Sequence, residues 1–497
     1  MGVNMKKICI FLLFVLVFNL LTACAASGDG DTAADTTSAD MSTDIAEETT
    51  EPPEYTAPGV KYDGEEITFY IWHTDTKWQL TMMDGIYAEE ENGEPMNDAF
   101  FRRTSTVEEL LDVSISTYLN TSMSGYNSSI QAGDDAYGVG IANASSLNGM
   151  LGVTGLLLDL NTIGTLDLER SWWDSKATDE FTIGGKVFTT TGDLCVYNTG
   201  AAGCLYFNKE MIEEYSLDSP YKLVNDKKWT IDKLYEHSAA VVRDLDGNGV
   251  YDEKDVLGIG CSASVLQQCI CSSGIRVTTK NSEGISELTL NNPKTTIVID
   301  KLIKLLRDKN IAMYSNDYSG KATTGDVFTD VMLPSFIANR LLFNFNWIFA
   351  ALDLRDMEAD FGIIPMPLFD EKQDEYYSLL SPYWSAFITV PSTCSDTDMI
   401  GNLLDAMGYY SQQLVTTAFI DVTVTNKALR DDDSANMLNI IFDSMVYDLY
   451  NVYGWGSIYN SVAKCADTGV NNFASSYASM EASAQAAIEK TFEQLIG

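Results

Sequence analysis

Predicted strands and a predicted helix alternate near the start of the folded chain, and this alternation restricts the fold more than any other sequence feature. The run EEITFYIW at 65–72 is rich in β-branched and aromatic residues and predicts a strand. An apolar helical pattern follows, which Asn97 and Asp98 can cap. Two further strands are predicted at 113–118 and within 137–146. Strands that alternate with helices favour an α/β fold with a mostly parallel sheet.

The ends of these strands are the first candidate binding positions. In a parallel sheet, ligands bind in the crevice beyond the carboxyl ends of the strands. Trp72 and Asp75 lie at the end of the first strand, and Asn143 and Ser145 lie at the end of the third. We therefore expect these four side chains to contact a ligand, the tryptophan through its ring and the others through polar atoms.

The first 24 residues have the pattern of a secretory signal. Lys6 and Lys7 precede an apolar run from Ile8 to about Leu21, which is too short for a comfortable transmembrane helix. The last four residues of the segment, LTAC, resemble the bacterial lipobox, which implies cleavage before Cys24 and a lipid on its thiol. An ordinary signal with an incidental cysteine is the alternative.

Residues 24–60 are predicted to be a lipidated cysteine followed by a disordered tether. The segment 25–60 contains nine acidic residues, no lysine or arginine, and scarcely any large apolar side chain. Such a segment cannot bury enough surface to offset chain entropy, and its like charges keep it extended. The folded body is therefore expected to begin near Lys61, at the extracellular face of the cell membrane.

Charge and cysteine content argue against two classes of site. The formal net charge of -40 argues against nucleic-acid binding, which needs a basic surface. The body contains seven cysteines, an odd number with no metal-type CxxC pair, which makes a zinc site unexpected. We expect mostly buried free thiols, with a Cys195–Cys204 disulfide as the alternative.

An ordered series of short segments resembles the extracellular solute-binding proteins of ABC importers, in particular the carbohydrate-type group of Gram-positive bacteria. After the lipobox and the first strand, the matching segments are GLLLDL, GGKVFTTT, LYFNKEMIEEYSL, WTIDKL, DLDGNGVYDEKDVLGIG, DFGIIPMP and AFITVPS. The resemblance implies an α/β, two-lobed clamp of the type II periplasmic-binding-protein class. Such a clamp closes on a small-molecule solute, delivers it to an ABC permease and performs no chemistry. We expect a monomer held at the membrane by its lipid.

The resemblance also implies discontinuous lobes, because the family's chain crosses between its lobes more than once. The crossings are expected near 195–206, near 383–387 and after Asp421. The expected boundaries are 1–23 for the signal peptide, 24–60 for the tether, 61–195 plus about 385–432 for the N-terminal lobe, and 196–384 plus about 433–497 for the C-terminal lobe.

The sharpest chemical motif is DLDGNGVYDEKD at 244–255, which has the spacing of an EF-hand loop. Hard oxygen donors around one point suit Ca²⁺, and Gly249 stands where the loop needs a sharp turn. Position 12 is aspartate where the motif usually has glutamate, and a surface turn that binds nothing is the alternative. The expected ligands of a structural calcium ion are Asp244, Asp246, Asn248, the Val250 carbonyl, Asp252 and Asp255.

The sequence offers little material for catalysis. The chain has two histidines, His73 and His237, so a histidine-based triad has almost nothing to draw on. No P-loop motif is present. A glycoside hydrolase, which needs only two carboxylates, is one alternative, although no acid pair can be singled out. A surface lipoprotein that uses the same clamp as a solute sensor or adhesin is the other.

Aromatic residues make up 11% of the chain, which suits a carbohydrate site. Sugars present apolar C–H faces that stack on flat rings, and hydroxyl groups that bind amides and carboxylates. Peptide or polyol ligands fit nearly as well, whereas an anionic ligand would want an arginine, and the expected cleft segments offer none. Strand ends, crossings and the family resemblance select Trp72, Asp75, Trp78, Asn143, Ser145, Tyr206, Asn346, Trp347, Tyr383, Trp384, Ser385 and Trp455.

Overall fold

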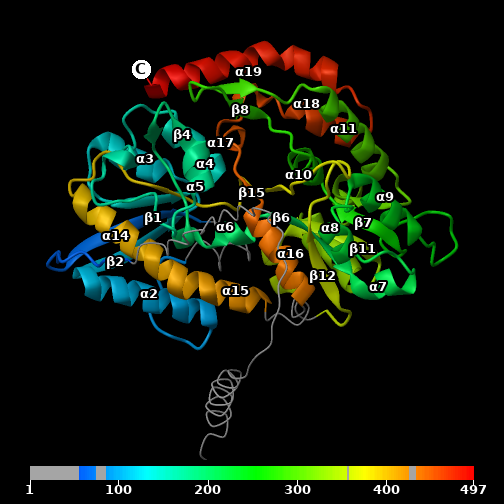
Figure 1. The fold of residues 1–497 in the computed structure, drawn as a ribbon, viewed down its shortest axis with the longest axis horizontal. Helices are drawn as coiled ribbons and strands as arrows, with labels where there is room; N and C mark the ends of the chain where they lie inside the picture. Colours follow the sequence, from blue (N-terminus) through cyan, green and yellow to red (C-terminus); the bar gives the residue numbers. More distant parts are fainter. Residues whose placement is uncertain (1–54, 74–84, 355–356, 425–431, 497) are drawn as a thin grey trace, which may run out of the picture. The chain divides into compact units, whose positions relative to one another are not determined.

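The computed structural model describes residues 55–73, 85–354, 357–424 and 432–496. The predictions for Asp75, Trp78 and Cys24, for the signal segment and for most of the tether lie outside the described residues. Two separate larger sheets organise the described chain (Figure 1). We call the elements around them the first lobe and the second lobe.

The first sheet is built around the strand predicted from EEITFYIW. Its strand order is β14-β3-β1-β2, with bounds Glu65–Trp72 for β1, Val113–Asn120 for β2, Val139–Ala142 for β3 and Phe387–Thr389 for β14. β1 pairs in parallel with β2 and β3, and β14 joins β3 antiparallel. The predicted first strand is confirmed residue for residue, and the predicted mostly parallel pairing is confirmed with it.

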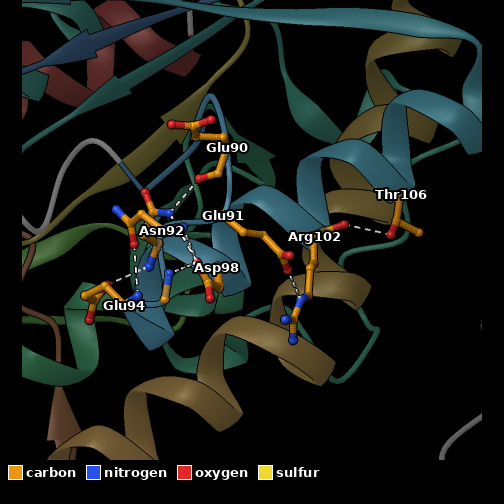
Figure 2. Close-up of polar contacts among 9 residues, drawn as sticks. Glu90, Glu91, Asn92, Glu94, Asp98, Arg102 and Thr106 are labelled. Atoms are coloured by element: carbon orange, nitrogen blue, oxygen red, sulfur yellow. Dashed lines mark hydrogen bonds and ion pairs between the residues drawn. The ribbon is translucent and has the colours of Figure 1, made fainter.

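The helix between β1 and β2 begins earlier than predicted. Helix α2 spans Pro95–Leu111 and is capped by Glu94, whose carboxylate accepts the Asn97 N–H at 2.7 Å (Figure 2). Asp98 lies in the first turn, where its carboxylate accepts two backbone N–H groups of the preceding turn. The cap predicted at Asn97 and Asp98 is therefore wrong, because proline at the first helical position moves the start toward the N-terminus.

The second sheet has the strand order β10-β7-β11-β6-β12. Its bounds are Gly203–Asn208 for β6, Leu257–Cys261 for β7, Ala312–Tyr314 for β10, Leu341–Trp347 for β11 and Phe361–Pro365 for β12. β10, β7 and β11 run parallel, whereas β6 runs antiparallel to β11 and β12. Nearly every residue of these strands is buried, as expected for a sheet covered on both faces.

Three short strand pairs complete the sheets. They are β4 Thr182–Ile183 with β5 Lys186–Val187, β8 Thr278–Lys280 with β9 Ser286–Leu288, and β13 Ser378–Leu379 with β15 Met445–Val446.

The helices divide between the lobes according to their packing (Figure 1). Besides α2, the first lobe carries α3 Ser124–Ala132, α4 Ala144–Leu151, α5 Ser175–Phe181, α14 Thr397–Tyr410 and α15 Thr417–Val424. The second lobe carries α7 Lys209–Glu214, α8 Pro220–Asn225, α9 Ile231–Ala240, α10 Ser264–Ser272, α11 Pro293–Leu306, α12 Leu333–Ile337, α13 Ala351–Leu354, α16 Asp432–Asp443 and α18 Asn460–Thr468. The remaining helices are α6 Tyr197–Gly200, α17 Tyr450–Tyr453 and α19 Phe473–Ile496.

The C-terminal helix α19 contacts both lobes. It packs on α18 and β9 of the second lobe. Near its end, the carbonyl oxygens of Gln494 and Leu495 accept hydrogen bonds from Thr154 and Lys186 of the first lobe, both at 3.1 Å. The passage between α15 and α16 lies outside the described residues, so the boundary expected at about 432 stays a prediction.

Two chain segments that connect the lobes lie side by side. In the first, Thr190 bridges to Ile388 of β14 before the chain enters β6. In the second, Leu380 bridges to Ala202 before the chain returns to the first sheet. The crossings expected near 195–206 and near 383–387 overlap these two segments, which two isolated bridges join.

A single carboxamide locks the two crossings together. Asn198 in α6 donates from Nδ2 to the Ala386 carbonyl oxygen at 2.8 Å and to Thr191 Oγ1 at 2.7 Å. Its Oδ1 accepts the Ala386 N–H at 2.6 Å. The side chain is 4% exposed, so water does not compete with these hydrogen bonds.

The described chain begins with an aromatic contact on the first lobe. The Tyr55 ring stacks on Tyr409 of α14 with centroids 4.7 Å apart, and meets Trp172 edge-on at 5.8 Å. Trp172 is itself fixed, because its indole N–H donates to Asp405 at 3.0 Å. Packing therefore starts before Lys61, where the folded body was expected to begin.

The seven body cysteines are free, and all except Cys394 are buried. Burial raises the pKa of the Cys195 thiol to about 12, so this thiol stays neutral and packs as a small apolar group. The expectation of mostly buried free thiols is confirmed, and the Cys195–Cys204 disulfide is not formed.

We predict that Asn198→Ala lowers the free energy of unfolding by about 2–3 kcal/mol, because it leaves the buried Ala386 N–H without its partner and the Ala386 carbonyl oxygen with Thr191 Oγ1 alone. Urea denaturation of the described body measures this change. The control is Asn436→Ala, which removes an exposed carboxamide that bonds Asn225. Equal stability of the two variants would show that the crossings do not depend on Asn198.

Candidate functional site

The end of β3 is tied to the second crossing. Asn143 follows β3 and caps α4, with its Oδ1 accepting the Ser146 N–H at 2.9 Å. Its Nδ2 donates to the Tyr383 carbonyl oxygen at 3.1 Å, and the Ser145 N–H donates to the Pro382 carbonyl oxygen at 3.3 Å. Asn143 is 1% exposed, so here it positions the crossing, whereas the exposed Ser145 side chain remains accessible.

Four aromatic rings run from the end of β1 to the second lobe. Trp72 meets Tyr383 with ring centroids 5.3 Å apart, Tyr383 meets Trp384 at 5.0 Å, and Trp384 meets Phe349 at 5.4 Å. All three contacts are edge-to-face, which is a favourable arrangement for aromatic pairs. We call these four rings the aromatic line. Tyr383 is its most accessible member, with 42% of the side chain exposed.

A cavity of about 390 Å³ lies at the carboxyl ends of the parallel strands of the second sheet. Ser262 follows β7, Ser315 follows β10, and Asn346 and Trp347 end β11. Because β10, β7 and β11 are parallel, their carboxyl ends meet at this edge, as the strand-end rule requires. The other lining residues are Ser264, Asn316, Ser319, Gly325, Asp326, Val327, Phe328, Met332 and Phe345.

Asn346 lines this cavity and carries a buried, unpaired hydrogen-bond donor. Its Oδ1 accepts the Trp347 N–H at 2.8 Å, which fixes the carboxamide. Its Nδ2 is buried and makes no hydrogen bond to the described protein. A buried donor left unpaired costs about 1–3 kcal/mol, so an acceptor atom from a ligand or water is favoured there. Asp326 is the one charged residue in the described lining, and no cation stands beside it in that lining.

Trp347 connects the cavity with the aromatic line. It lines the cavity and packs, like Trp384, against an apolar cluster that includes Phe349. The same cluster contains Phe100 of α2 and Tyr197 of the first crossing. The cavity edge and the aromatic line are therefore neighbouring parts of one region to which both lobes and both crossings contribute.

Tyr206 and Trp455 do not join this region. Tyr206 on β6 is fully buried and donates its hydroxyl to the Ile348 carbonyl oxygen at 2.6 Å. Trp455 is 2% exposed, stacks on Tyr453 and donates to Thr491 of α19 at 2.9 Å. Both rings serve the core, because each polar atom already has a partner inside the protein. Of the other candidates, Ser385 is buried at the second crossing.

Sequence reasoning missed Phe349, Ser262 and Ser315. The strand-end rule was applied to the first sheet only, and its extension to β7 and β10 would have selected both serines. Phe349 follows Trp347 by two residues, and the sequence carried no signal that distinguishes its ring from a core ring.

The EF-hand-like loop lies at the other end of β7 from the cavity. Loop oxygens of Asp244, Asp246 and Asp255 lie within 4.8 Å of one another. Asp255 is fully buried and accepts two loop N–H groups, whereas the Asp252 carboxylate lies 3.8 Å from Lys321 Nζ. Backbone N–H groups, chiefly that of Gly249, hold the pKa of Asp244 below its ordinary value. Three converging carboxylates of this kind fit a hard divalent cation.

No family model matches the sequence, and no curated protein matches it. Among solved structures, the fold is similar to that of UspC from Mycobacterium tuberculosis, with 13% identity, a TM-score of 0.55, and coverage of 85% of this chain and 100% of that one. The fold is also similar to that of a solute-binding protein of an ABC transporter from Thermotoga lettingae, bound with α-D-tagatose. The identity is 12% and the TM-score is 0.53, with coverage of 86% of this chain and 100% of that one. A third similar fold is that of the GacH receptor of Streptomyces glaucescens, studied with acarbose. The identity is 11% and the TM-score is 0.52, with coverage of 87% of this chain and 98% of that one.

These similarities confirm the expected fold class, a two-lobed α/β architecture of the periplasmic-binding-protein type. The order of the chain through the two sheets agrees with it, since β14 returns to the first sheet after β6 to β12 have built the second.

Proposed function

We propose that the protein captures an uncharged carbohydrate and delivers it to the permease of an ABC importer. The observation that carries the proposal is the aromatic line with its accessible Tyr383, beside a cavity that offers an unpaired amide donor at Asn346. Flat rings suit the C–H faces of a sugar, and amide and hydroxyl groups suit its hydroxyl rim. The solved neighbours of this fold include proteins bound with tagatose and with maltotetraose.

The site favours a neutral ligand. A carboxylate ligand would have to approach Asp326 without a cation in the described lining to compensate its charge. The Asn346 Nδ2 donor, in contrast, can donate a hydrogen bond to a hydroxyl oxygen of a neutral ligand and would then no longer be unpaired.

Binding without chemistry is the activity that this geometry supports. The aromatic line joins the buried rings of Trp72 in the first lobe and Phe349 in the second, and a solute would stack on the exposed Tyr383 ring between them. A solute that binds one lobe arrangement better shifts the population toward it, and a permease can recognise that arrangement. The solved neighbours are binding proteins, which supports a non-enzymatic role.

We also propose that Cys24 carries a lipid that holds the body at the extracellular face of the membrane. The LTAC segment and the acidic tether support this anchor. Within the described ranges, no helix is long and apolar enough to cross a membrane.

A structural Ca²⁺ at 244–255 is the remaining element of the proposal. Asp244, Asp246 and Asp255 would hold the ion, with Asn248 and the Val250 carbonyl as the further oxygens of the motif. Such an ion would neutralise the converging carboxylates before β7, away from the solute.

In a thermal-shift screen of residues 55–497, we predict stabilisation by one class of neutral mono- or oligosaccharide. A ligand at 100 times its Kd adds about 2.7 kcal/mol to the free energy of unfolding. A response to peptides or polyols alone would overturn the carbohydrate assignment. A permease-independent sensor or adhesin would be indicated if no solute of any class stabilised the protein.

Tyr383→Ala should weaken sugar binding about tenfold, because loss of an exposed stacking ring costs ~1.4 kcal/mol. Isothermal titration calorimetry measures the change. Tyr118→Ala is the matched control, since Tyr118 is 46% exposed on the edge strand β2 and outside the aromatic line. Equal losses in both variants would contradict the assigned site. Release of a shortened sugar during titration would indicate a hydrolase instead.

Calcium should raise the melting temperature, and a chelator should reverse the rise. At 100 times its Kd, the ion should add about 2.7 kcal/mol to the free energy of unfolding. The double variant Asp244→Asn, Asp246→Asn should lose this response, whereas Glu213→Gln, which removes an exposed acid elsewhere, should keep it. Sugar affinity should be unchanged by chelation. If chelation abolished sugar binding while the fold persisted, the structural role would be wrong.

Cys24→Ala should release the protein from membranes into the soluble fraction of expressing cells, which fractionation and lipid labelling detect. Cys394→Ala, which changes a cysteine in the folded body, should leave membrane association intact. Retention of the Cys24 variant on the membrane would exclude the lipid anchor.

A further inference from the structure

Helix α5 of the first lobe contacts the returning segment 445–450. α5 belongs to the first lobe because Phe181 meets Phe387 of β14, with ring centroids 4.8 Å apart. Its capping residue Asp174 accepts a hydrogen bond from the Tyr447 hydroxyl at 2.7 Å. At the other end of the helix the Phe181 ring meets the Tyr447 ring, with centroids 6.2 Å apart, so side chains at both ends make the contact.

The returning segment is tied to the second lobe, and its Tyr447 ring also meets Phe387 of β14 in the first lobe, with centroids 6.1 Å apart. Its strand β15 pairs with β13, and the β13 residue Leu379 accepts a hydrogen bond from Gln268 of α10 at 3.0 Å. The contact between α5 and 445–450 is accordingly a contact between the lobes.

Two carboxylates lie at this contact. Glu180 of α5 accepts the Leu449 N–H at 2.8 Å. The preceding residue, Asp448, is 8% exposed and accepts the N–H groups of Tyr450 at 2.9 Å and of Val277 in the turn before β8 at 3.5 Å. Because residues 448 and 449 are adjacent, both acids are placed at one turn of the chain.

These two carboxyls favour protonation more than ordinary carboxyls do. Burial, together with the charge of Asp448, raises the pKa of Glu180 to about 7. Burial raises the pKa of Asp448 to about 6. Lys280 and Arg276 act in the opposite direction on Glu180, but Lys280 donates to the Asp179 carbonyl oxygen and not to a carboxylate.

Other ionisable groups lie at the same contact, namely Asp174, Tyr447, Asp179, Lys280 and Arg276. Arg276 donates to the Cys271 carbonyl oxygen at 3.1 Å. Burial raises the pKa values of Cys271 and Tyr450, which lie within the field of Asp448, to about 12 each. Glu180 and Asp448 are the carboxyls at the contact whose pKa is raised, to about 7 and about 6.

We propose that Glu180 and Asp448 form a proton-sensitive latch between the lobes, in which protonation removes a like-charge repulsion and strengthens the contact of α5 with 445–450. A carboxyl with a raised pKa binds its proton more tightly in the folded state than in the unfolded state. The latch is therefore fully stabilised below the unfolded pKa and weakens as the pH rises through about 7. Acidification shifts the lobe population toward the arrangement described here.

The test compares wild type, Glu180→Gln and Asp179→Asn by thermal unfolding between about pH 5 and pH 8 without solute. The introduced carboxamide would keep an acceptor for the Leu449 N–H without the charge, so Glu180→Gln should melt about 2 °C above wild type near pH 8 and equal it near pH 5. Asp179→Asn removes an exposed charge from the same helix and should follow wild type at every pH. Asp448→Asn should move the wild-type transition to lower pH.

Hydrogen exchange places the effect at the lobe contact. After correction for intrinsic rates, amide protection in 445–450 should rise on acidification in wild type and stay level in Glu180→Gln. A pH-independent difference between these two proteins would overturn the proposal, as would a pH effect on melting without a change in 445–450. Neither readout involves a sugar, so failure here would leave the proposed carbohydrate function standing.

Discussion

The hydrogen bonds between Asn198 and Ala386 are the contacts on which the rest of the arrangement depends. They join two chain segments that are far apart in sequence, and these segments are the described connections between the lobes. Backbone groups that leave a sheet must find new partners, and here one buried carboxamide supplies both a donor and an acceptor. The crossings therefore stay paired next to Tyr383 and Trp384, the two residues of the second crossing whose rings belong to the aromatic line.

The two sheets present the same kind of edge to the candidate site. In each, parallel strands end together, and the residues that follow carry amides, hydroxyls and rings. The first sheet uses its amide at Asn143 to hold the crossing, whereas the second leaves the Asn346 amide unpaired beside a cavity. The division gives one lobe a positioning role and leaves the other with hydrogen-bonding capacity for a ligand.

Sequence reasoning reached the first strand and the strand ends because periodicity and β-branching are local properties. It placed Trp72 and Tyr383 in one group, and the structure brings them into contact. It could not separate the exposed Tyr383 from the buried Trp72, Tyr206 and Trp455, since a ring that packs in the core has the same sequence signature as a ring that faces a ligand. That difference depends on which polar partner the folded chain supplies, such as the Ile348 carbonyl oxygen for Tyr206.

The Tyr55 contact also determines which lobe first bears a force applied at the N-terminal end of the described chain. Its ring is stacked on Tyr409, and Trp172 closes one side against Asp405. Tension applied through the N-terminal segment would enter the body at α14 and pass into the first sheet before it reached either crossing. A force on this end of the chain would therefore load the first lobe before the lobe that carries Asn346.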